Sequence, residues 1–255
     1  VPERGNLMDW GDNRGNRSDR FLACVAYLDG IHPSVVMCRG YYTRTVLAAY
    51  DWNGKELKER WIFDSNHPGC EDYAGQGNHN LRVGDVDGCD EIIYGSCAID
   101  HNGKGLYTTK MGHGDAIHLT HFDPSRKGLQ VWDCHENKRD GSTYRDAATG
   151  EILFQIKDST DVGRCMAADI DPTQPGVEMW SLASGGIRNI KGEVVKARVR
   201  GLSCNMAVWW DGDLLRELLD RNIVSKYNWK KGVCERIAIF EGALSNSGTK
   251  ATPCL

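Results

Sequence analysis

Short runs of apolar and polar residues predict β-strands joined by tight turns. Ser34–Arg39 is apolar, Thr45–Trp52 is rich in residues that favour strands, and Leu57–Phe63 alternates between apolar and polar positions. The dipeptide Asn53-Gly54 separates the second run from the third, and Asn-Gly between two such runs is a strong signal for a β-hairpin. This part of the chain is therefore predicted to form consecutive strands.

Similar turn signals recur along the rest of the chain, whereas helical periodicity is rare. The one good helical pattern, Asp213–Asp220 (DLLRELLD), is too short to define a helical layer. The 29 glycines among 255 residues also favour many tight turns, so the fold class predicted is all-β. The further hairpin-like turns are Asn102-Gly103, Thr149-Gly150, Lys191-Gly192 and Asp211-Gly212.

A weak internal repeat refines this prediction. Each copy consists of an apolar strand, an acidic turn and a second apolar strand, and the copies begin at Asp85, His121 and Asp169. These starts are 36 and 48 residues apart, a spacing that suggests the blades of a β-propeller. A β-sandwich with similar turns is the alternative. Since no Pro/Ser/Gly-rich linker interrupts the chain, residues 1–255 are interpreted as one domain.

Carboxylates gather in the first and third copies of the repeat. Calcium takes six to eight hard oxygen ligands, and a D-x-D turn offers two carboxylates together with backbone carbonyls. We therefore expect Ca²⁺ at both turns, although Asp side chains that bond to their own backbone would explain the same pattern. In the second copy His121 and Gln130 replace the acids, which favours a plain turn. The expected metal ligands are Asp85, Asp87, Asp90 and Glu91 in the first copy and Asp169, Asp171 and Glu178 in the third.

Composition and charge exclude several classes of protein. The 31 Lys and Arg against 35 Asp and Glu give a formal charge of −4, which disfavours binding of nucleic acid through bulk charge. No apolar run is long enough to span a membrane. The 10 cysteines contain no C-x-x-C pair, which argues against zinc-knuckle and thioredoxin-type sites. Most are expected to be buried thiols, because a domain of 255 residues does not need disulfides for stability, and disulfides in an oxidising compartment are the alternative. The chain begins at Val1 without an initiator Met, which suggests processing or excision from something longer.

Five histidines and two cations are the other candidates for chemistry. The segment Gly112–His118 invites a metal interpretation, but taken singly each His is expected to be a hydrogen-bonded structural residue. By chemistry alone Arg164 and Lys250 are ordinary surface cations. The histidines considered are His79, His113, His118, His121 and His135.

Several long strings resemble a known family. They include GNRSDRFLACVAYLDG at Gly15–Gly30, PSVVMCRGYYTRTVLAAYDW at Pro33–Trp52 and DEIIYGSCAIDHNGKGLYTT at Asp90–Thr109. The strings YAGQGNHNL, HGDAIH, AADIDP, WWDGDLLRELLD and SNSGTKATPCL continue the match almost to the C-terminus. Together they resemble the bacterial rhamnogalacturonan lyases of polysaccharide lyase family eleven.

The resemblance implies a fold, a cofactor and a substrate. Members of this family are eight-bladed β-propellers that bind calcium and cleave the rhamnogalacturonan I backbone of pectin. The chain would cover about half of such a catalytic domain, with about four blades, and the missing remainder of the propeller would be its partner. The segment Asp213–Asp220 should then be a strand or irregular rather than a helix. The resemblance also implies a secreted or periplasmic location.

The same resemblance implies the site residues. Calcium-assisted β-elimination at the 4-O-linked galacturonate would use Lys250 as the base and Arg164 as the group that binds the substrate carboxylate, although the two roles could be exchanged. His79 is a further candidate for the base. The residues expected to line the sugar site are Asn246, Ser247, Gly248 and Thr249.

Two other kinds of function stay open at this point. A calcium-stabilised propeller could bind pectin without cleaving it, or a half-propeller could serve only as a structural partner of another chain. Whether a lyase of this type would act within the polymer or from its end does not follow from the sequence.

Overall fold

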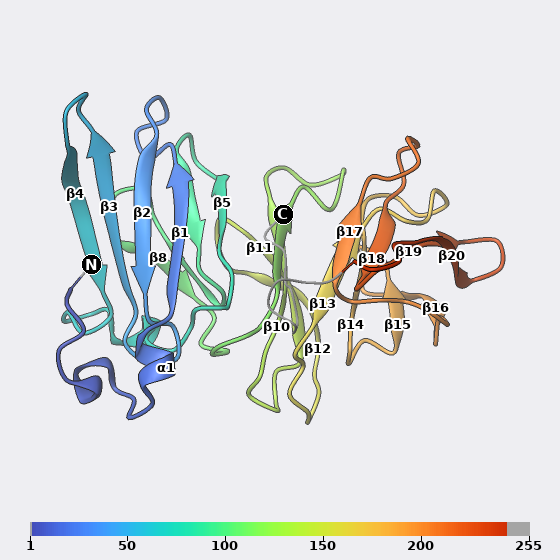
Figure 1. Cartoon of the computed structure of the whole chain (residues 1–255), viewed down its shortest axis with the longest axis horizontal. Coiled ribbons are helices and arrows are strands. Elements are labelled where there is room, and N and C mark those ends of the chain that lie inside the picture. Colours follow the sequence, from blue (N-terminus) through green and yellow to red (C-terminus); the bar gives the residue numbers. More distant parts are fainter. Residues whose placement is uncertain (1, 244–255) are drawn as a thin grey trace.

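The computed structural model describes residues 2–243, and over this range the fold is all-β, as predicted. Twenty strands form five antiparallel sheets of four strands each. Each sheet contains four strands that are consecutive in the sequence, and strands adjacent in the sequence are adjacent in the sheet. The sheets follow one another across the molecule in chain order, from β1–β4 to β17–β20 (Figure 1).

The strands are short, and their bounds divide them evenly among the sheets. The first two sheets comprise β1 Phe21–Ala26, β2 Ser34–Arg39, β3 Val46–Trp52, β4 Leu57–Asp64, β5 Arg82–Asp85, β6 Asp90–Ile93, β7 Cys97–Ile99 and β8 Gly105–Thr108. The third and fourth comprise β9 Ile117–Thr120, β10 Gln130–Cys134, β11 Ser142–Asp146, β12 Ile152–Ile156, β13 Cys165–Ala168, β14 Glu178–Ser181, β15 Gly186–Arg188 and β16 Val194–Ala197. The fifth comprises β17 Met206–Val208, β18 Glu217–Asp220, β19 Ile223–Asn228 and β20 Val233–Ile239.

Helical structure is limited to single turns in the described part of the chain. These turns are η1 Leu7–Trp10, α1 Gly15–Ser18 and η2 Glu71–Tyr73. None of the helices described between residues 2 and 243 has the length and apolar character needed to cross a membrane.

The turn residues and the apolar runs in the sequence predicted most of these strands. β2 has the predicted bounds, and β3 and β4 pair around Asn53-Gly54 as the hairpin signal indicated. The segment Asp213–Asp220 contains β18 and no helix, because its apolar residues face neighbouring strands in a sheet. The described residues form five sheets instead of the expected four or so. The expected number came from the resemblance, and the repeat in the sequence marked only the second, third and fourth of these sheets.

Four apolar clusters hold the sheets together, one between each successive pair. The first joins Leu47 to Ile92, and the next joins Ile93 to Val131. Trp132 belongs to the cluster between the third and fourth sheets, and Trp180 to the cluster between the fourth and fifth. Burial of these side chains between sheets is the main source of stability, since a single sheet cannot cover its own faces.

The cysteines do not contribute crosslinks to this core. Nine of them are described, and all nine are free thiols. Four are buried, namely Cys38, Cys97, Cys134 and Cys165, and the other five are half-buried. The described cysteines are therefore free thiols as expected, although fewer than half of these nine are fully buried.

The strand order gives the molecule two chemically different ends. Because neighbouring strands run antiparallel, the loop between the second and third strands of a sheet lies at the same end as the connection to the next sheet. The acidic turns, which join first strands to second strands, lie at the opposite end. At about 3.3 Å per residue, strands of four to six residues separate the two ends by roughly 10–20 Å.

Candidate functional site

Arg164 lies on the connection between β12 and β13 and points into a cluster of polar side chains. Its Nη1 donates a hydrogen bond to Oδ2 of Asp115 at 3.0 Å, and both side chains are largely buried. Asp115 comes from the connection between β8 and β9. The ion pair therefore links the connection before the third sheet to the connection after it. The residue predicted to bind a substrate carboxylate is therefore held by a carboxylate of the protein.

His79 extends this cluster toward the first sheet. Its Nε2 lies 3.1 Å from Oδ1 of Asp115, so both oxygens of that carboxylate are engaged. The hydroxyls of Tyr41 and Tyr42, from the loop between β2 and β3, lie 2.9 Å from Nδ1 and 3.1 Å from Nε2 of His79. One loop of the first sheet and the connections that lead to the second, third and fourth sheets thus meet at one place.

His113 packs among these aromatic rings and reaches a second carboxylate. Its ring lies 4.1 Å from that of Tyr42 and 4.9 Å from that of His79, measured between centroids. Nδ1 contacts the carbonyl of Gly77, whereas Nε2 is buried, lies 3.6 Å from Oε1 of Glu136 and has no hydrogen-bond partner among the residues described. A buried ring nitrogen without a partner fits a ligand to a metal ion.

The electrostatics of the cluster favour binding of a cation. Burial lowers the pKa of His113 to about 4, so the ring is neutral at physiological pH. Burial raises the pKa of Glu136 to about 7, and the neighbouring Asp115 carboxylate adds to this shift. Burial also acts to raise the pKa of Asp115, but the hydrogen bond from His79 and the charge of Arg164 outweigh it and keep the net pKa below its ordinary value. Ligand atoms of His79, His113, Asp115 and Glu136 all lie within 4.8 Å of one another.

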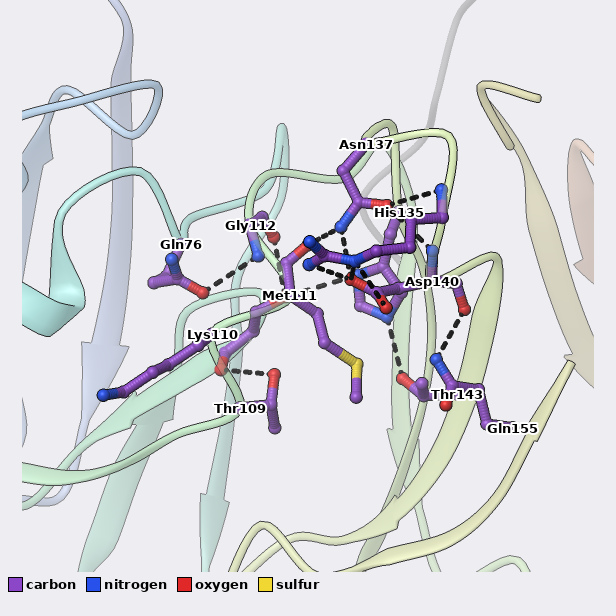
Figure 2. Close-up of polar contacts among 12 residues, drawn as sticks. Gln76, Thr109, Lys110, Met111, Gly112, His135, Asn137, Asp140, Thr143 and Gln155 are labelled. Carbon is purple, nitrogen blue, oxygen red and sulfur yellow. Dashed lines mark hydrogen bonds and ion pairs between the residues drawn. The ribbon is translucent and has the colours of Figure 1, made fainter. Parts of the chain in front are cut away.

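The loop that carries His113 and Asp115 is fixed on both sides (Figure 2). The backbone N–H of Gly112 donates to Oε1 of Gln76 at 3.0 Å, and Nδ2 of Asn137 donates to the carbonyl of Met111 at 2.7 Å. These bonds connect the loop to segments before β5 and after β10. Such anchoring reduces the reorganisation needed when a ligand binds.

The remaining candidate histidines are structural, as expected. Nε2 of His118 lies 3.1 Å from the carbonyl of Cys165, and burial lowers the pKa of His118 to about 4. His121 bonds the carbonyl of Arg126 within its own turn. His135 contacts the hydroxyl of Thr143 at 2.9 Å in the protein interior (Figure 2).

Only one member of the predicted catalytic pair lies within the described range. Arg164 belongs to the cluster above, while Lys250 lies outside the described residues. The same holds for the predicted sugar-binding segment, whose members are Asn246, Ser247, Gly248 and Thr249.

The first acidic turn brings together only part of its predicted ligand set. Asp87 and Glu91 lie within 4.8 Å of two residues from the β7–β8 hairpin, Asp100 and His101. Asp85 accepts bonds from the N–H groups of Asp87 and Gly88 instead, in the manner of an Asx turn.

Asp90 of the same turn forms a hydrogen bond with the first sheet, at the residue that follows β1. Its Oδ2 accepts a 2.7 Å hydrogen bond from the N–H of Tyr27. Burial raises the pKa of Glu91, which faces the turn, to about 6. Asp87 and Glu91 therefore share one cluster, whereas Asp85 and Asp90 bond to other partners.

The turn between β13 and β14 contains an unsatisfied carboxylate. Oε2 of Glu178 accepts bonds from the N–H groups of Ile170 and Asp171 at 2.9 and 2.8 Å. Its buried Oε1 has no hydrogen-bond partner among the described residues. Burial raises the pKa of Glu178 to about 8, and nearby Asp169 and Asp171 contribute to the shift. A cation facing Oε1 would relieve this burial cost.

The turn between β17 and β18 also gathers carboxylates, which the sequence did not predict. A lysine side chain of the protein lies among them. Asp211, Asp213 and Glu217 surround Nζ of Lys226 at 2.5, 2.6 and 2.9 Å. Lys226 comes from β19, so sequence spacing within the turn could not reveal it. The ammonium group occupies the position among these carboxylates where a metal ion would bind.

Asp115, Glu136, Tyr41 and Tyr42 were missed as members of the main site. The string HGDAIH contains Asp115 and drew attention to the neighbouring histidines, but nothing local marks Glu136 or the tyrosines. These residues meet only because loops from successive sheets lie at the same end of the molecule.

Comparisons with known proteins agree on one family. The model of the family described as "Rhamnogalacturonan lyase family 11, C-terminal domain" matches residues 1–255. The rhamnogalacturonan endolyase YesW of Bacillus subtilis (strain 168) is 52% identical over 258 residues, which cover 100% of this chain and 41% of that protein. The rhamnogalacturonan exolyase YesX of the same organism is 54% identical over 273 residues and is covered to 44%.

Solved structures show the same fold. The crystal structure of YesW superimposes with a TM-score of 0.94 over 99% of this chain and 43% of that one, at 52% identity. A Bacillus licheniformis rhamnogalacturonan lyase gives 0.94 at 54% identity and 43% coverage of its chain, and the exotype lyase YesX gives 0.92 at 53% identity and 45% coverage. The chain spans less than half the length of the relatives it matches. Because the model of the C-terminal domain matches residues 1–255, the chain belongs to rhamnogalacturonan lyase family 11 and corresponds to the C-terminal domain of that family.

Proposed function

We propose that this chain supplies part of the active site of a lyase that cleaves the rhamnogalacturonan I backbone of pectin by β-elimination. The observation that carries the proposal is the position of Arg164, held by Asp115 beside two histidines and Glu136. Membership of the family and the names of two relatives, one an endolyase and one an exolyase, support the reaction class. These relatives differ in mode of action, so we assign neither mode.

The proposed reaction removes a proton from C5 of a galacturonate and expels the rhamnose linked at O4. The electron pair left at C5 is delocalised into the carboxylate, so positive charge beside that carboxylate stabilises the transition state. Arg164 can bind a carboxylate through two parallel hydrogen bonds. Asp115 holds the guanidinium in place but competes for it, so substrate binding must displace or share this ion pair.

The base is proposed to be Lys250, whose pKa cationic neighbours such as Arg164 would lower. It takes the C5 proton, the double bond between C4 and C5 forms as the C4–O4 bond breaks, and the departing rhamnose oxygen takes up a proton from solvent. No water is added across the bond, in contrast to glycoside hydrolysis. The product end is an unsaturated galacturonate. The segment Asn246, Ser247, Gly248 and Thr249 is proposed to contact the sugar, since it directly precedes Lys250.

A divalent cation is proposed at His79, His113, Asp115 and Glu136. The buried Nε2 of His113 and the raised pKa of Glu136, about 7, fit a place for a cation. The ion, when bound, would supply further positive charge for a substrate carboxylate. The chain itself supplies the neutral ring of His113 and orients it through its contact with the carbonyl of Gly77.

Calcium at the acidic turns is proposed to be structural. Glu91 with Asp87 and Asp100, and Glu178 with Asp169 and Asp171, offer the oxygen ligands that Ca²⁺ prefers. These turns lie at the end of the sheets opposite to Arg164, at a distance of roughly 10 Å or more. Calcium there would stabilise the turns and would not touch the reacting sugar.

We also propose that the five sheets are consecutive blades of a β-propeller. Contacts between β1 and β5, β5 and β9, β9 and β13, and β13 and β17 place the first strands of successive sheets together, as around an axis. Phe21 and Trp52 are 58% and 60% exposed on the first sheet, and Trp209 and Ile239 are 69% and 50% exposed on the last. The remainder of the propeller is the proposed partner that covers these apolar residues. Because pectin is a polymer of the plant cell wall, the proposed location is secreted or periplasmic.

The rival proposal is a domain that binds pectin without cleaving it. Incubation with rhamnogalacturonan I distinguishes the two, because elimination produces unsaturated uronate that absorbs ultraviolet light. Because this chain is proposed to supply only part of the active site, the test uses it within the complete propeller. We expect absorbance to rise with the unaltered complete protein and not with Arg164→Ala in it. Binding of the polymer without a rise in absorbance would favour the rival, and neither binding nor cleavage would contradict both.

A further inference from the structure

A hollow beside the site opens toward the N-terminal segment. A cavity of about 530 Å³ is lined by Met8, Gly11 and Tyr42, among others, and a second of about 370 Å³ shares Met8 and Gly11 with it. The second is also lined by Arg14 and Arg17. The two spaces adjoin through their common residues and together are large enough for sugar units.

A chain of direct contacts connects Arg17 to the main site. Its guanidinium carbon lies 4.6 Å from the centre of the Tyr42 ring, and the hydroxyl of that tyrosine lies 3.1 Å from Nε2 of His79. His79 in turn contacts Asp115, the partner of Arg164. A single tyrosine ring thus separates Arg17 from His79, and Asp115 connects His79 to Arg164.

The charge of this hollow is not balanced by the protein. Arg17 pairs with Asp12 at 3.1 Å, and its side chain is still 38% exposed. Arg14, three residues earlier, is exposed, and its guanidinium has no hydrogen bond or ion pair among residues 2–243. In the second cavity two guanidinium groups therefore face the single carboxylate of Asp12, while Asp9 and Arg44 line the first cavity.

Arg20 adds to this positive field. Its Nε is shielded from solvent and has no hydrogen-bond partner in the described range. Its charge acts on the hydroxyls of Tyr41 and Tyr42, which places the guanidinium near the same loop. Arg20 therefore adds a third guanidinium group on the side of the site that faces the first sheet.

We propose that Arg14 and Arg17 form a second carboxylate subsite, which binds a galacturonate two sugar units away from the one that reacts. This inference rests on the proposed function. Rhamnogalacturonan I alternates rhamnose with galacturonate, so its charges recur at every second sugar along the chain. A guanidinium presents two parallel donors to a carboxylate, and Tyr42 fixes the plane of Arg17. The repeated anion of this polymer thus matches cationic groups on both sides of the histidines.

The test compares ligands with one and with several galacturonates. The probes are a trisaccharide with a single galacturonate between two rhamnoses, a longer rhamnogalacturonan I oligosaccharide with three galacturonates, and the same longer oligosaccharide with its carboxylates reduced to alcohols. Binding to the full chain is measured by titration calorimetry. We expect the unaltered protein to bind the longer native probe about tenfold or more tightly than either of the others.

A double variant, a conservative variant and one matched control test the residues. Arg14→Gln with Arg17→Gln should remove the preference for the longer native probe. Arg60→Gln should leave the preference intact, because Arg60 pairs with Asp51 on the first sheet and lines neither cavity. Arg17→Lys should restore only part of it, since an ammonium is a point charge.

The outcomes separate this inference from the proposed function. If the double variant keeps the full preference, the subsite is not at Arg14 and Arg17, and the proposed function is unaffected. If the unaltered protein binds none of the probes, the proposed function itself is contradicted. Arg14→Gln alone is the variant least expected to disturb folding, because that exposed side chain forms no hydrogen bond or ion pair among residues 2–243. It should reduce the preference for the longer probe without changing the midpoint of thermal unfolding.

Discussion

Gln130 and Glu178 occupy the same position in successive sheets and make the same contacts. Each is the first residue of the second strand of its sheet and is fully buried. Oε1 of Gln130 accepts bonds from the N–H groups of Phe122 and Asp123 at 3.0 and 3.2 Å, as Oε2 of Glu178 does from the corresponding pair. The other side-chain atom differs, since Nε2 of Gln130 donates to the carbonyl of Gly128 at 2.9 Å.

This pair predicts the result of Glu178→Gln. The new amide can keep both backbone bonds and donate to the carbonyl of Gly176, which corresponds to Gly128 in sequence position. Without metal, the variant should be more stable than the unaltered protein at pH 8 by about 1–3 kcal/mol, because a buried carboxylate without a second partner is removed. Chemical denaturation in excess chelator measures the difference.

The pH dependence gives an independent check. The pKa of Glu178 is about 8 in the folded protein against an ordinary value of 4.5. Between these values the folded state binds more protons than the unfolded state, so the free energy of unfolding falls as pH rises from about 4.5 to about 8 and levels off above that. Glu178→Gln should flatten this fall, while added Ca²⁺ should stabilise the unaltered protein most at the higher pH. Equal pH slopes for both proteins would contradict this account.

Lys226→Met should lower the stability of the protein, because it removes the positive charge from the turn between β17 and β18. The substitution leaves Asp211, Asp213 and the buried Glu217 without their ammonium group. We expect a loss on the order of 2 kcal/mol, since removing one partner leaves an uncompensated buried charge. Calcium should restore part of this loss in the variant.

The control for this prediction lies on the same sheet. Lys231→Met removes an exposed ion pair with Glu235 and should change the stability by less than about 0.5 kcal/mol. If Lys226→Met is as stable as the unaltered protein in chelator, the ammonium does not compensate the carboxylates.

The fold was largely predictable because its signals are local. Asn53-Gly54 and the other glycine turns each fix a hairpin from a few neighbouring residues, and β2 has the predicted bounds. The turn at Asp211 was predicted as a hairpin but not as a copy of the acidic repeat. Its compensating charge, Lys226, lies fifteen residues away on another strand, where no local pattern could connect the two.

The site was less predictable because its members are distant in sequence. Arg164 and Asp115 are 49 residues apart, and His79 is 37 residues from Tyr42. Only the antiparallel order of the strands, which returns each connection to the same end, brings them together. The carboxylates were predictable as turn residues, and Asp85 forms such a local turn, but the bond between Asp90 and Tyr27 depends on packing between sheets.

Gly114→Ala should damage the site without unfolding the protein. A Cβ at this position would lie 1.9 Å from the carbonyl oxygen of Cys134 and 2.9 Å from Oδ1 of Asn78, so the loop carrying His113 and Asp115 would have to move. A displacement of this kind costs about a hundredfold in rate. Cleavage rates beside a thermal unfolding curve measure both effects, and full activity with an unchanged curve would show that the loop tolerates the shift.

Substitutions of Arg164 and of Lys250 are expected to affect elimination and substrate binding differently. Arg164→Ala should raise the barrier to elimination by roughly 3 kcal/mol or more, the scale of a lost oxyanion donor, and Arg164→Lys should rescue poorly because an ammonium cannot bind a carboxylate through two parallel bonds. Lys250→Ala should abolish elimination while oligosaccharide binding survives, since it removes only the proton acceptor. Arg139→Ala is the matched control, because this exposed arginine at the same end pairs only with Asp140 in the described chain. Wild-type turnover by Lys250→Ala would exclude this lysine as the base and leave His79, 3.1 Å from Asp115, as the next candidate.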